Sequence, residues 1–488
     1  MNKNDNNNYQ ALGVKVASGL LWSLGERILA NGVSFVVSLI LARLILPEEY
    51  GIIAVMTIFI NISNVFVESG FGTALIQKKD ADDVDFDTVF ITQFCLSILL
   101  YLIVNLAAPT IAKFYDLPQL VRIFKVYGLV IVFGCIKNVQ HAYVSKQMKF
   151  RLFFFSTLGG TLVSAIVGIT LAYFEFGVWA LVGQVLFNSI ADSVVLFFSI
   201  KWKPRIRFSF NKFKQMYSFS WRLLVSTLLT TIYDNIYGLI IGKIYKPENL
   251  ALYNKGNTFP TLIATNVIGP LQSATFPALA MAQEDKLRLK SMTRKTSAVT
   301  AYIMWPMLIG MACVARPMIN VLITNKWEGC VIFLQITCIG AMLGPIDSPN
   351  AQVIKSVGRS DIMLKLDIVK KFIGLLVLFI TIQYGVIAFA CGRMLVVLMS
   401  SLLNILPNKK IMDYGIWEQL RDCWSEFICS AIMAIFVVLV GHFGANDITK
   451  LIIQIVVGVI TYLSASLIIR PTGFQYAKET VISLLKKR

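Results

Sequence analysis

Leu39 to Ile52 reads LILARLILPEEYGI, and Leu239 to Leu252 reads LIIGKIYKPENLAL, at an offset of 200 positions without a gap. In both copies an apolar run carries a basic residue at the same place and is followed by a Pro-Glu pair. The identical or conservatively exchanged positions are Leu39/Leu239, Ile40/Ile240, Arg43/Lys243, Leu44/Ile244, Pro47/Pro247 and Glu48/Glu248. Chance similarity between two apolar helix ends is the alternative interpretation. The shared register favours an internal repeat, which predicts a chain built of two similar halves.

The composition around this repeat places the chain in a membrane. Of the 488 residues, 56% are hydrophobic and only 15% are charged, whereas a soluble domain carries about 25% charged residues. Apolar runs of about 18 residues or more recur from end to end. These features exclude collagen, disordered tails and small disulfide-stabilised secreted modules.

Apolar runs between charged or Pro/Gly breaks predict about fourteen transmembrane helices, since each crossing needs roughly 20 residues. The fold class is therefore an all-α integral membrane protein. No predicted connection is long enough for a soluble catalytic domain. The expected spans are 16–42, 51–75, 87–111, 123–144, 152–173, 178–200, 216–241, 250–280, 296–315, 331–354, 364–383, 386–406, 423–443 and 449–469.

Lysine and arginine collect on alternate connections, as expected when short cytoplasmic loops carry the basic residues. The connections at 201–214 and 286–295 are the most basic. This pattern predicts a multi-pass protein of the bacterial cytoplasmic membrane with both termini in the cytoplasm. The net charge of +18 is explained by the orientation of the chain in the membrane and by attraction of its basic residues to anionic lipid headgroups. No nucleic-acid partner is therefore expected.

The repeat and the spans together predict four parts of the chain. They are an N-terminal lobe of six helices (1–200), a basic cytoplasmic linker (201–215), a C-terminal lobe of six helices (216–410), and two additional helices with a basic tail (411–488). An even number of spans separates the two copies of the repeat, so the lobes share one orientation and a pseudo-two-fold axis along the membrane normal. This is an arrangement typical of transporters, with a cavity between the lobes.

Basic residues inside predicted spans are candidate cavity residues, because each costs roughly 2.5 to 3.5 kcal/mol at a helix centre on insertion scales. Arg27 is the strongest candidate, since it lies about 16 Å from the cytoplasmic end of its helix, too deep for easy snorkelling. Its neighbour Glu26 points about 100° away around the helix. Asp234 is the deepest acid, and we expect it to pair with a cation or to bind a coupling ion.

The other intramembrane bases have competing explanations. Arg222 and Lys137 lie near an inner end, where a snorkelling side chain and a cavity role are equally plausible. Lys255 and Arg393 lie toward the outer end, as interfacial anchors or as cavity residues. Lys370 and Lys371 follow Asp367 at ion-pair spacing on one helical face, which favours a structural pair.

Cysteine and histidine give no sign of a metal centre. The eight cysteines are scattered singly, without the paired spacing of a chelating motif. The chain has only two histidines, which argues against a zinc enzyme and against a histidine proton relay. We expect no cofactor and no enzymatic activity.

Three stretches resemble one transporter family. WSLGERILANGVSFVVSLILARLILPEEYGI (22–52), VESGFGTALIQKKD (67–80) and DNIYGLIIGKIYKPENLALYNKGNTFP (234–260) look like the matching segments of the polysaccharide transporter family, the Wzx-type oligosaccharide flippases. FPALA (276–280) and VGRSDIMLK (357–365) agree. One departure is Leu250-Ala251-Leu252-Tyr253, where the family has Leu-Gly-Tyr-Tyr, which puts the role of that turn in doubt.

The resemblance implies the multidrug/oligosaccharidyl-lipid/polysaccharide exporter fold, with two lobes that rock about a central cavity. It also implies a cargo of undecaprenyl-diphosphate-linked sugar repeat units. Membrane lipids are expected partners, together with a polysaccharide polymerase and its chain-length machinery. The alternative function is cation-coupled drug efflux, which would favour an acid-rich cavity, whereas basic residues outnumber acids within these spans.

Overall fold

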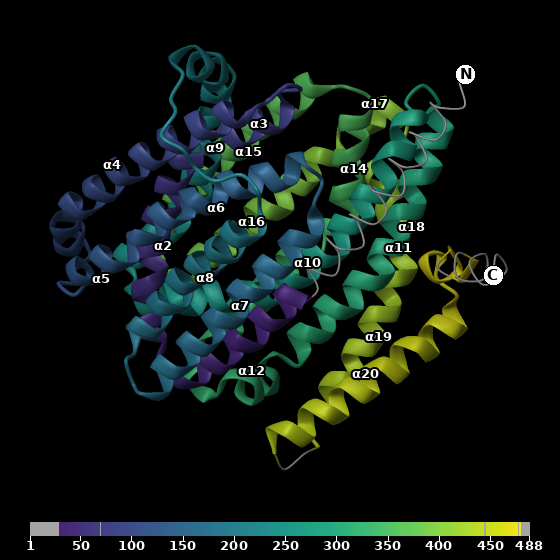
Figure 1. Ribbon diagram of the computed structural model, residues 1–488. Coiled ribbons are helices and arrows are strands. Elements are labelled where there is room, and N and C mark those ends of the chain that lie inside the picture. Colours follow the sequence, from purple (N-terminus) through teal and green to yellow (C-terminus); the bar gives the residue numbers. More distant parts are fainter. Residues whose placement is uncertain (1–28, 69, 444–445, 477, 480–488) are drawn as a thin grey trace. The chain divides into compact units, whose positions relative to one another are not determined.

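The computed structural model describes residues 29–68, 70–443, 446–476 and 478–479, and throughout them the regular structure is helical, with no strand (Figure 1). The chain divides into two compact units, residues 1–251 and 252–488. The basic linker expected at 201–215 lies within the first unit. The lobe boundaries drawn from the sequence remain predictions.

The described part of the first unit, from residue 29 onward, contains a helix at Leu29–Leu44 and eight further helices. These are α2 (Pro47–Glu68), α3 (Phe71–Gln77), α4 (Asp83–Tyr115), α5 (Leu120–Tyr127), α6 (Leu129–Lys146), α7 (Phe150–Tyr173), α8 (Val178–Ser199) and α9 (Phe210–Ile244). Helix α10 (Pro247–Met281) begins in this unit and continues into the second.

The second unit holds the rest of α10 and the helices that follow it. They are α11 (Lys286–Cys313), α12 (Ala315–Ile323), the 3-10 helix η1 (Asn325–Cys330), α13 (Val331–Ala341), α14 (Gly344–Ser356), α15 (Ser360–Thr381), α16 (Val386–Ile405), α17 (Asn408–Met412), α18 (Ile416–Asp422), α19 (Trp424–Val440) and α20 (Asp447–Ile469). Helix α19 packs against both α11 and α20.

The described helices confirm an all-α multi-pass membrane protein. Eight of them are long and apolar enough to span a bilayer, and ten spans result if each of two bent helix pairs counts as one. Bulky apolar side chains such as Leu106, Phe198 and Ile468 are about four-fifths exposed, as expected of a surface that faces lipid. The total of about fourteen spans remains a prediction.

The internal repeat predicted from the sequence corresponds to the same local structure in both copies. The helix at Leu29–Leu44 ends shortly before Pro47, and α9 ends at Ile244, shortly before Pro247. Each proline opens the next helix, where its missing N–H costs no hydrogen bond. Glu48 and Glu248 follow in the first turn, where a carboxylate is stabilised by the helix dipole.

Glycines let α2 and α9 cross closely within the first unit. A Cβ at Gly242 would lie 2.9 Å from Val55 Cγ2, and one at Gly238 would lie 2.9 Å from Ile58 Cδ1. Gly238 and Gly242 are four residues apart and so lie on one face of α9, the small-residue pattern that brings membrane helices together. Gly51 of α2 approaches the Pro247 carbonyl, which leaves no room for a side chain.

An ionic cluster in the first unit fastens the segment between α8 and α9 to the start of α4. We call it the first clamp: Asp82, Asp85 and Asp87 with Trp202, Arg207 and Lys212. Asp87 is fully buried and accepts hydrogen bonds from Trp202 Nε1 at 3.1 Å, from the Arg205 backbone N–H at 3.2 Å and from Arg207 Nε at 2.7 Å. Lys212 donates to Asp82 at 2.6 Å.

A second cluster fastens the segment before α19 to the start of α11 in the second unit. We call it the second clamp: Lys290 and Arg294 with Tyr414, Glu418 and Asp422. Arg294 Nε donates to Asp422 at 2.6 Å, and its Nη2 donates to Glu418 at 2.8 Å. Lys290 lies 2.9 Å from the other Glu418 oxygen, and the Tyr414 hydroxyl donates to Asp422 at 2.7 Å.

Candidate functional site

A polar pocket lies within the second unit between α10, α13 and α16. Its volume is about 290 Å³, and its polar side chains are Tyr253, Asn257, Thr261, Thr337 and Arg393. Tyr253, Asn257 and Thr261 follow each other at intervals of four residues, so they lie on one face of α10.

Small residues keep this pocket open on the side opposite α10. Gly340 and Ala341 of α13 line it, and a Cβ at Gly340 would meet Met394 Cγ at 3.4 Å. Thr337 donates its hydroxyl hydrogen bond to Asn257, which fixes two of the polar groups relative to each other. The pocket is therefore built on three helices and not on mobile loops.

The chemistry of the lining suits an anionic, hydroxyl-rich ligand. An arginine fork makes paired, charge-assisted hydrogen bonds to phosphate oxygens. The amide of Asn257 and the hydroxyls of Thr261 and Thr337 can exchange hydrogen bonds with sugar hydroxyls, and Tyr253 offers a flat apolar wall with a polar tip. Among the described lining residues there is no carboxylate, so the pocket does not favour a cationic ligand.

Lys255 lies outside this pocket, although the sequence makes it a candidate of the same kind. It is two residues from Tyr253 and from Asn257, and so about 200° around the helix. The side chain is 8% exposed, with Nζ 5.6 Å from the centre of the buried Trp327 ring of η1. Lys255 therefore packs between α10 and η1, and Arg393 takes its place as the cation at the pocket.

Arg222 and Asp234 are both exposed residues of α9 in the first unit. The Arg222 guanidinium lies 5.8 Å from the centre of the Trp221 ring. Arg222, Ser226, Thr230 and Asp234 follow at intervals of four residues, which makes a polar stripe along one face of α9. The assignment of this stripe to a substrate path remains a prediction.

Lys137 and Lys370 each contact a carboxylate within their own unit. Lys137 of α6 lies 2.8 Å from Asp192 of α8, whose side chain is 1% exposed. Lys370 of α15 lies 3.5 Å from Asp367, and it also donates to Asn404 of α16 at 2.6 Å. Asn404 in turn donates to Asp347 of α14 at 2.7 Å. Both lysines thus connect neighbouring helices.

Arg27 and Glu26, the candidates favoured most by the sequence, lie outside the residues that the structure describes. Sequence reasoning also missed several pocket residues, namely Tyr253, Asn257, Thr261 and Thr337. The one available signal was the four-residue spacing of polar side chains in an apolar helix. That signal is weak, because threonine and asparagine in membrane helices often bond to their own helix backbone.

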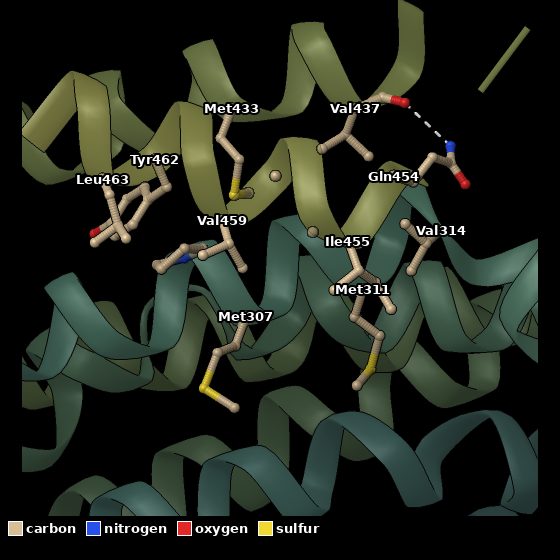
Figure 2. Close-up of a pocket in the computed structure, with 13 residues that line it drawn as sticks. Met307, Met311, Val314, Met433, Val437, Gln454, Ile455, Val459, Tyr462 and Leu463 are labelled. Carbon is tan, nitrogen blue, oxygen red and sulfur yellow. Dashed lines mark hydrogen bonds between the residues drawn. The ribbon is translucent and has the colours of Figure 1, made fainter. Parts of the chain in front are cut away.

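A second pocket of the same unit has the opposite character. It lies between α11, α19 and α20, has a volume of about 330 Å³, and is lined almost entirely by apolar side chains such as Met307, Met311 and Val459 (Figure 2). Its amide, Gln454, donates to the Val437 carbonyl at 3.1 Å, as the dashed line shows. The described residues that line it include no charged group. The polar pocket between α10, α13 and α16, which we call the Arg393 pocket, is therefore the better candidate for binding a polar head group.

Comparison with known proteins agrees with the resemblance seen in the sequence. A family profile described as "Polysaccharide biosynthesis protein" matches residues 40–332. The teichuronic acid biosynthesis protein TuaB of Bacillus subtilis (strain 168) is 23% identical over 413 residues, which covers 82% of this chain and 84% of the relative. The lipopolysaccharide biosynthesis protein WzxC of Escherichia coli (strain K12) is 21% identical over 424 residues, which covers 86% of each.

Solved structures share the fold at low sequence identity. The lipid II flippase MurJ in an inward closed conformation superposes with a TM-score of 0.73 at 14% identity, covering 92% of this chain and 99% of that one. An inward-facing multidrug resistance MATE family transporter of the MOP superfamily gives a TM-score of 0.63 at 12% identity, covering 81% and 99%. At such identities the likeness establishes the fold alone.

Proposed function

The chain belongs to the family of polysaccharide biosynthesis proteins, and from this premise we propose that it flips lipid-linked oligosaccharides across the cytoplasmic membrane. The cargo would be a polyprenyl-diphosphate carrying a sugar repeat unit, and the direction would be from the inner to the outer leaflet. Relatives named for teichuronic acid and lipopolysaccharide biosynthesis support this proposal. The protein would act as a transporter and not as an enzyme.

The physical task is to move a hydroxyl-rich anion through hydrocarbon. Each hydroxyl buried without a partner costs roughly 2 to 7 kcal/mol, so a polar path must replace its water. The observation that carries the proposal is the Arg393 pocket, which combines one guanidinium with amide and hydroxyl groups on three helices. The lipid tail would stay in the bilayer while the head group passes.

An energy source is available without ATP. When the cytoplasm is negative, outward movement of an anion is favoured by about 2.3 kcal/mol per charge per 100 mV. We place both termini and the basic connections in the cytoplasm on the distribution of lysine and arginine. A polymerase on the outer side would then consume the cargo. A multidrug transporter has the same fold. A site for a cationic drug would need a carboxylate, and the described residues that line the Arg393 pocket include none.

Deletion and complementation test this function. Deletion of the gene should abolish surface polysaccharide and leave polyprenyl-diphosphate-linked repeat units in the inner leaflet. The wild-type gene should restore export, Arg393→Ala should not, and Arg393→Lys should restore it in part, because a lysine lacks the planar fork. Arg316→Ala is the control, since Arg316 is an exposed base of the same unit that pairs with Glu328 at 2.6 Å.

Variants of Arg27, the strongest candidate from the sequence, are tested in the same complementation assay. Arg27→Ala should abolish export while the protein remains inserted, and Arg27→Lys should keep part of it. Full export in both Arg393→Ala and Arg27→Ala cells would refute a cationic binding site for the head group. Unchanged polysaccharide together with a new drug sensitivity in the deletion strain would favour efflux.

A further inference from the structure

The segment between α8 and α9 carries apolar side chains that the described helices of the first unit leave uncovered. Residues 200–209 form no helix. Ile206 is 99% exposed, Phe208 is 52% exposed, and Phe210, the first residue of α9, is 67% exposed. Apolar side chains are unfavourable in water, and several of them gathered at one place mark an interaction surface.

The extended backbone explains why these three side chains face the same way. Successive side chains of an extended chain point to opposite sides. The intervening Arg207 is half-buried, and its Nε donates to Asp87 of α4 at 2.7 Å. Ile206, Phe208 and Phe210 therefore lie on the side that faces away from α4, and the first clamp holds them there.

An aromatic group supports the exposed side chains from behind. The Phe213 ring lies 6.1 Å from the ring of Phe208 and 6.1 Å from that of Phe210, and it stacks on Tyr217 at 5.6 Å. Phe213 itself packs on Phe71 of α3 at 6.0 Å. The exposed surface is thus built on packed rings and on the ion pairs of the first clamp.

The same segment presents positive charge. Residues 201–214 include six basic residues and no acid. Arg207 and Lys212 belong to the first clamp, and Lys203 Nζ lies 3.9 Å from the centre of the Phe197 ring. Outside the clamp, four bases form no ion pair among the described residues, namely Lys201, Lys203, Arg205 and Lys214. Basic and apolar side chains therefore share one surface.

The position of this surface follows from the helices that it connects. Helices α4, α8 and α9 are each long and apolar enough to cross a bilayer. The first clamp joins the start of α4 to the segment between the end of α8 and the start of α9, so these three helix ends lie on the same side of the membrane. Phe198, in the last turn of α8, is 81% exposed. It extends the lipid-facing surface of α8 to the segment.

We propose that residues 198–214 form a membrane-surface anchor, which binds anionic phospholipid headgroups of the adjoining leaflet through its free-standing bases. Ile206, Phe208 and Phe210 insert between the headgroups. Basic and aromatic side chains are the ones that favour this level of a membrane. An acidic protein would match the charge, but a lipid surface also matches the exposed apolar side chains and their place at three helix ends.

This anchor is more than the orientation signal of the basic residues, because it prefers lipids of one charge. It also does not depend on the cargo of the transporter. The phosphate groups of a phosphatidylglycerol surface carry net negative charge and attract each nearby lysine or arginine, whereas the headgroups of phosphatidylcholine are neutral overall.

Lipid titration of the purified full-length protein in detergent tests the anchor. A lipid that binds the folded state raises the midpoint of thermal unfolding as its concentration increases. Dioleoylphosphatidylglycerol should act at concentrations roughly tenfold lower than dioleoylphosphatidylcholine. Lys203→Gln with Arg205→Gln should weaken the apparent affinity for phosphatidylglycerol at least tenfold, because each base near an anionic surface strengthens binding about fivefold. Salt should weaken binding to the wild type more than binding to this variant.

The matched control removes the same charge from the second unit. Lys286 and Arg288 are exposed bases at the start of α11, but they follow the exposed acids Glu284 and Asp285, so this stretch has no net charge. Lys286→Gln with Arg288→Gln should therefore leave the affinity for phosphatidylglycerol within about twofold of wild type. An equal loss in both double variants would overturn the proposal, and so would equal affinities of the wild type for the two lipids.

Ile206→Ser tests the apolar part of the anchor. This side chain is almost fully exposed, so its replacement removes no packing within the protein. Binding of phosphatidylglycerol should weaken several-fold, while its dependence on salt stays that of wild type. An unchanged affinity would show that the apolar side chains do not insert.

Photo-crosslinking distinguishes a lipid surface from a protein partner. A benzophenone amino acid at position 206 would be activated by light in membranes of the intact cell, and the adduct would be weighed by mass spectrometry. The expected adduct has the mass of one phospholipid. A crosslink to another protein in place of lipid would overturn the anchor and identify the segment as a protein-binding site.

Discussion

Each unit has one clamp that fastens a connecting segment to a long helix, and the two clamps have opposite polarity. In the first clamp the start of α4, with its N-cap Asp82, provides the acids, and the bases are Arg207 of the segment between α8 and α9 and Lys212 of the first turn of α9. In the second, α11 provides the bases and the segment before α19 provides the acids. An aromatic side chain accompanies each, Trp202 on Asp87 and Tyr414 on Asp422.

Both units thus fasten a connecting segment by ion pairs, and the long helix carries the acids in one unit and the bases in the other. An ion pair stabilises equally whichever side carries the anion. What differs is burial: Asp87 is fully buried, whereas the side chains of Asp422 and Arg294 are 21% and 37% exposed. The first clamp should therefore be the stronger, and it holds the basic segment between α8 and α9.

Asp87→Ala should have the largest effect. It leaves the Trp202 and Arg205 N–H groups and the Arg207 guanidinium without their acceptor, and breaking a buried pair costs about 3 to 5 kcal/mol. The midpoint of thermal unfolding in detergent should fall. Trypsin should also cut the basic segment 201–214 rapidly.

Asp83→Ala is the matched control, since Asp83 is an exposed acid one turn before Asp87 in α4. It should leave both the unfolding midpoint and the trypsin pattern nearly unchanged. Equal unfolding midpoints and equal trypsin patterns for Asp87→Ala and Asp83→Ala would mean that the first clamp does not hold the segment between α8 and α9.

Charge reversal of the second clamp should have an intermediate effect. It tests whether the acids and the bases of the clamp can exchange sides. Reversal of the helix side alone, Lys290→Asp with Arg294→Asp, or of the segment side alone, Glu418→Lys with Asp422→Arg, brings like charges together. Each should cost about 1 to 2 kcal/mol. The fourfold variant has the wild-type net charge and should lie within about 1 kcal/mol of wild type. If it is as unstable as the sum of the two halves, the acids and the bases cannot exchange sides.

The helices were predictable because their signals are local. Apolar runs predict spans, and a proline followed by glutamate predicts the helix starts at Pro47 and Pro247. The first-clamp pair of Asp87 with Arg207 joins residues far apart in the chain. No periodicity links such positions, so both clamps were invisible in the sequence.

The direction in which a side chain faces was predictable only in part. Lys255 and Arg393 look alike in the sequence, each a lone base in an apolar helix. The packing of α10 decides between them. A Cβ at Gly256 would lie 2.7 Å from Phe333 Cβ and 2.8 Å from the Cys330 carbonyl oxygen. The face of α10 that carries Gly256 therefore packs tightly against η1 and α13. Lys255 is buried there, while Tyr253 and Asn257 face the Arg393 pocket.

The smallest expected effect is an acid sensitivity specific to the first clamp. The hydrogen bond from Lys212 lowers the pKa of Asp82 to about 2, against about 3.9 in an unfolded chain. The unfolded state thus binds this proton first as the pH falls, so the stabilisation is complete above about pH 4 and is lost as the pH approaches 2. The side chain of Asp82 is 57% exposed, so salt should weaken the effect.

Lys212→Gln tests this contribution, because it removes the cation and keeps the carboxyl of Asp82; it also removes the longer contact of Lys212 with Asp85 at 3.5 Å. Unfolding midpoints measured between about pH 5 and pH 2 should fall less steeply for this variant than for wild type, since its Asp82 titrates nearly as in the unfolded chain. The two curves should approach each other toward pH 2, as Asp82 becomes protonated in both proteins. Parallel curves over the whole range would show that the pair of Lys212 with Asp82 adds nothing to the first clamp and that Asp87 alone holds the segment.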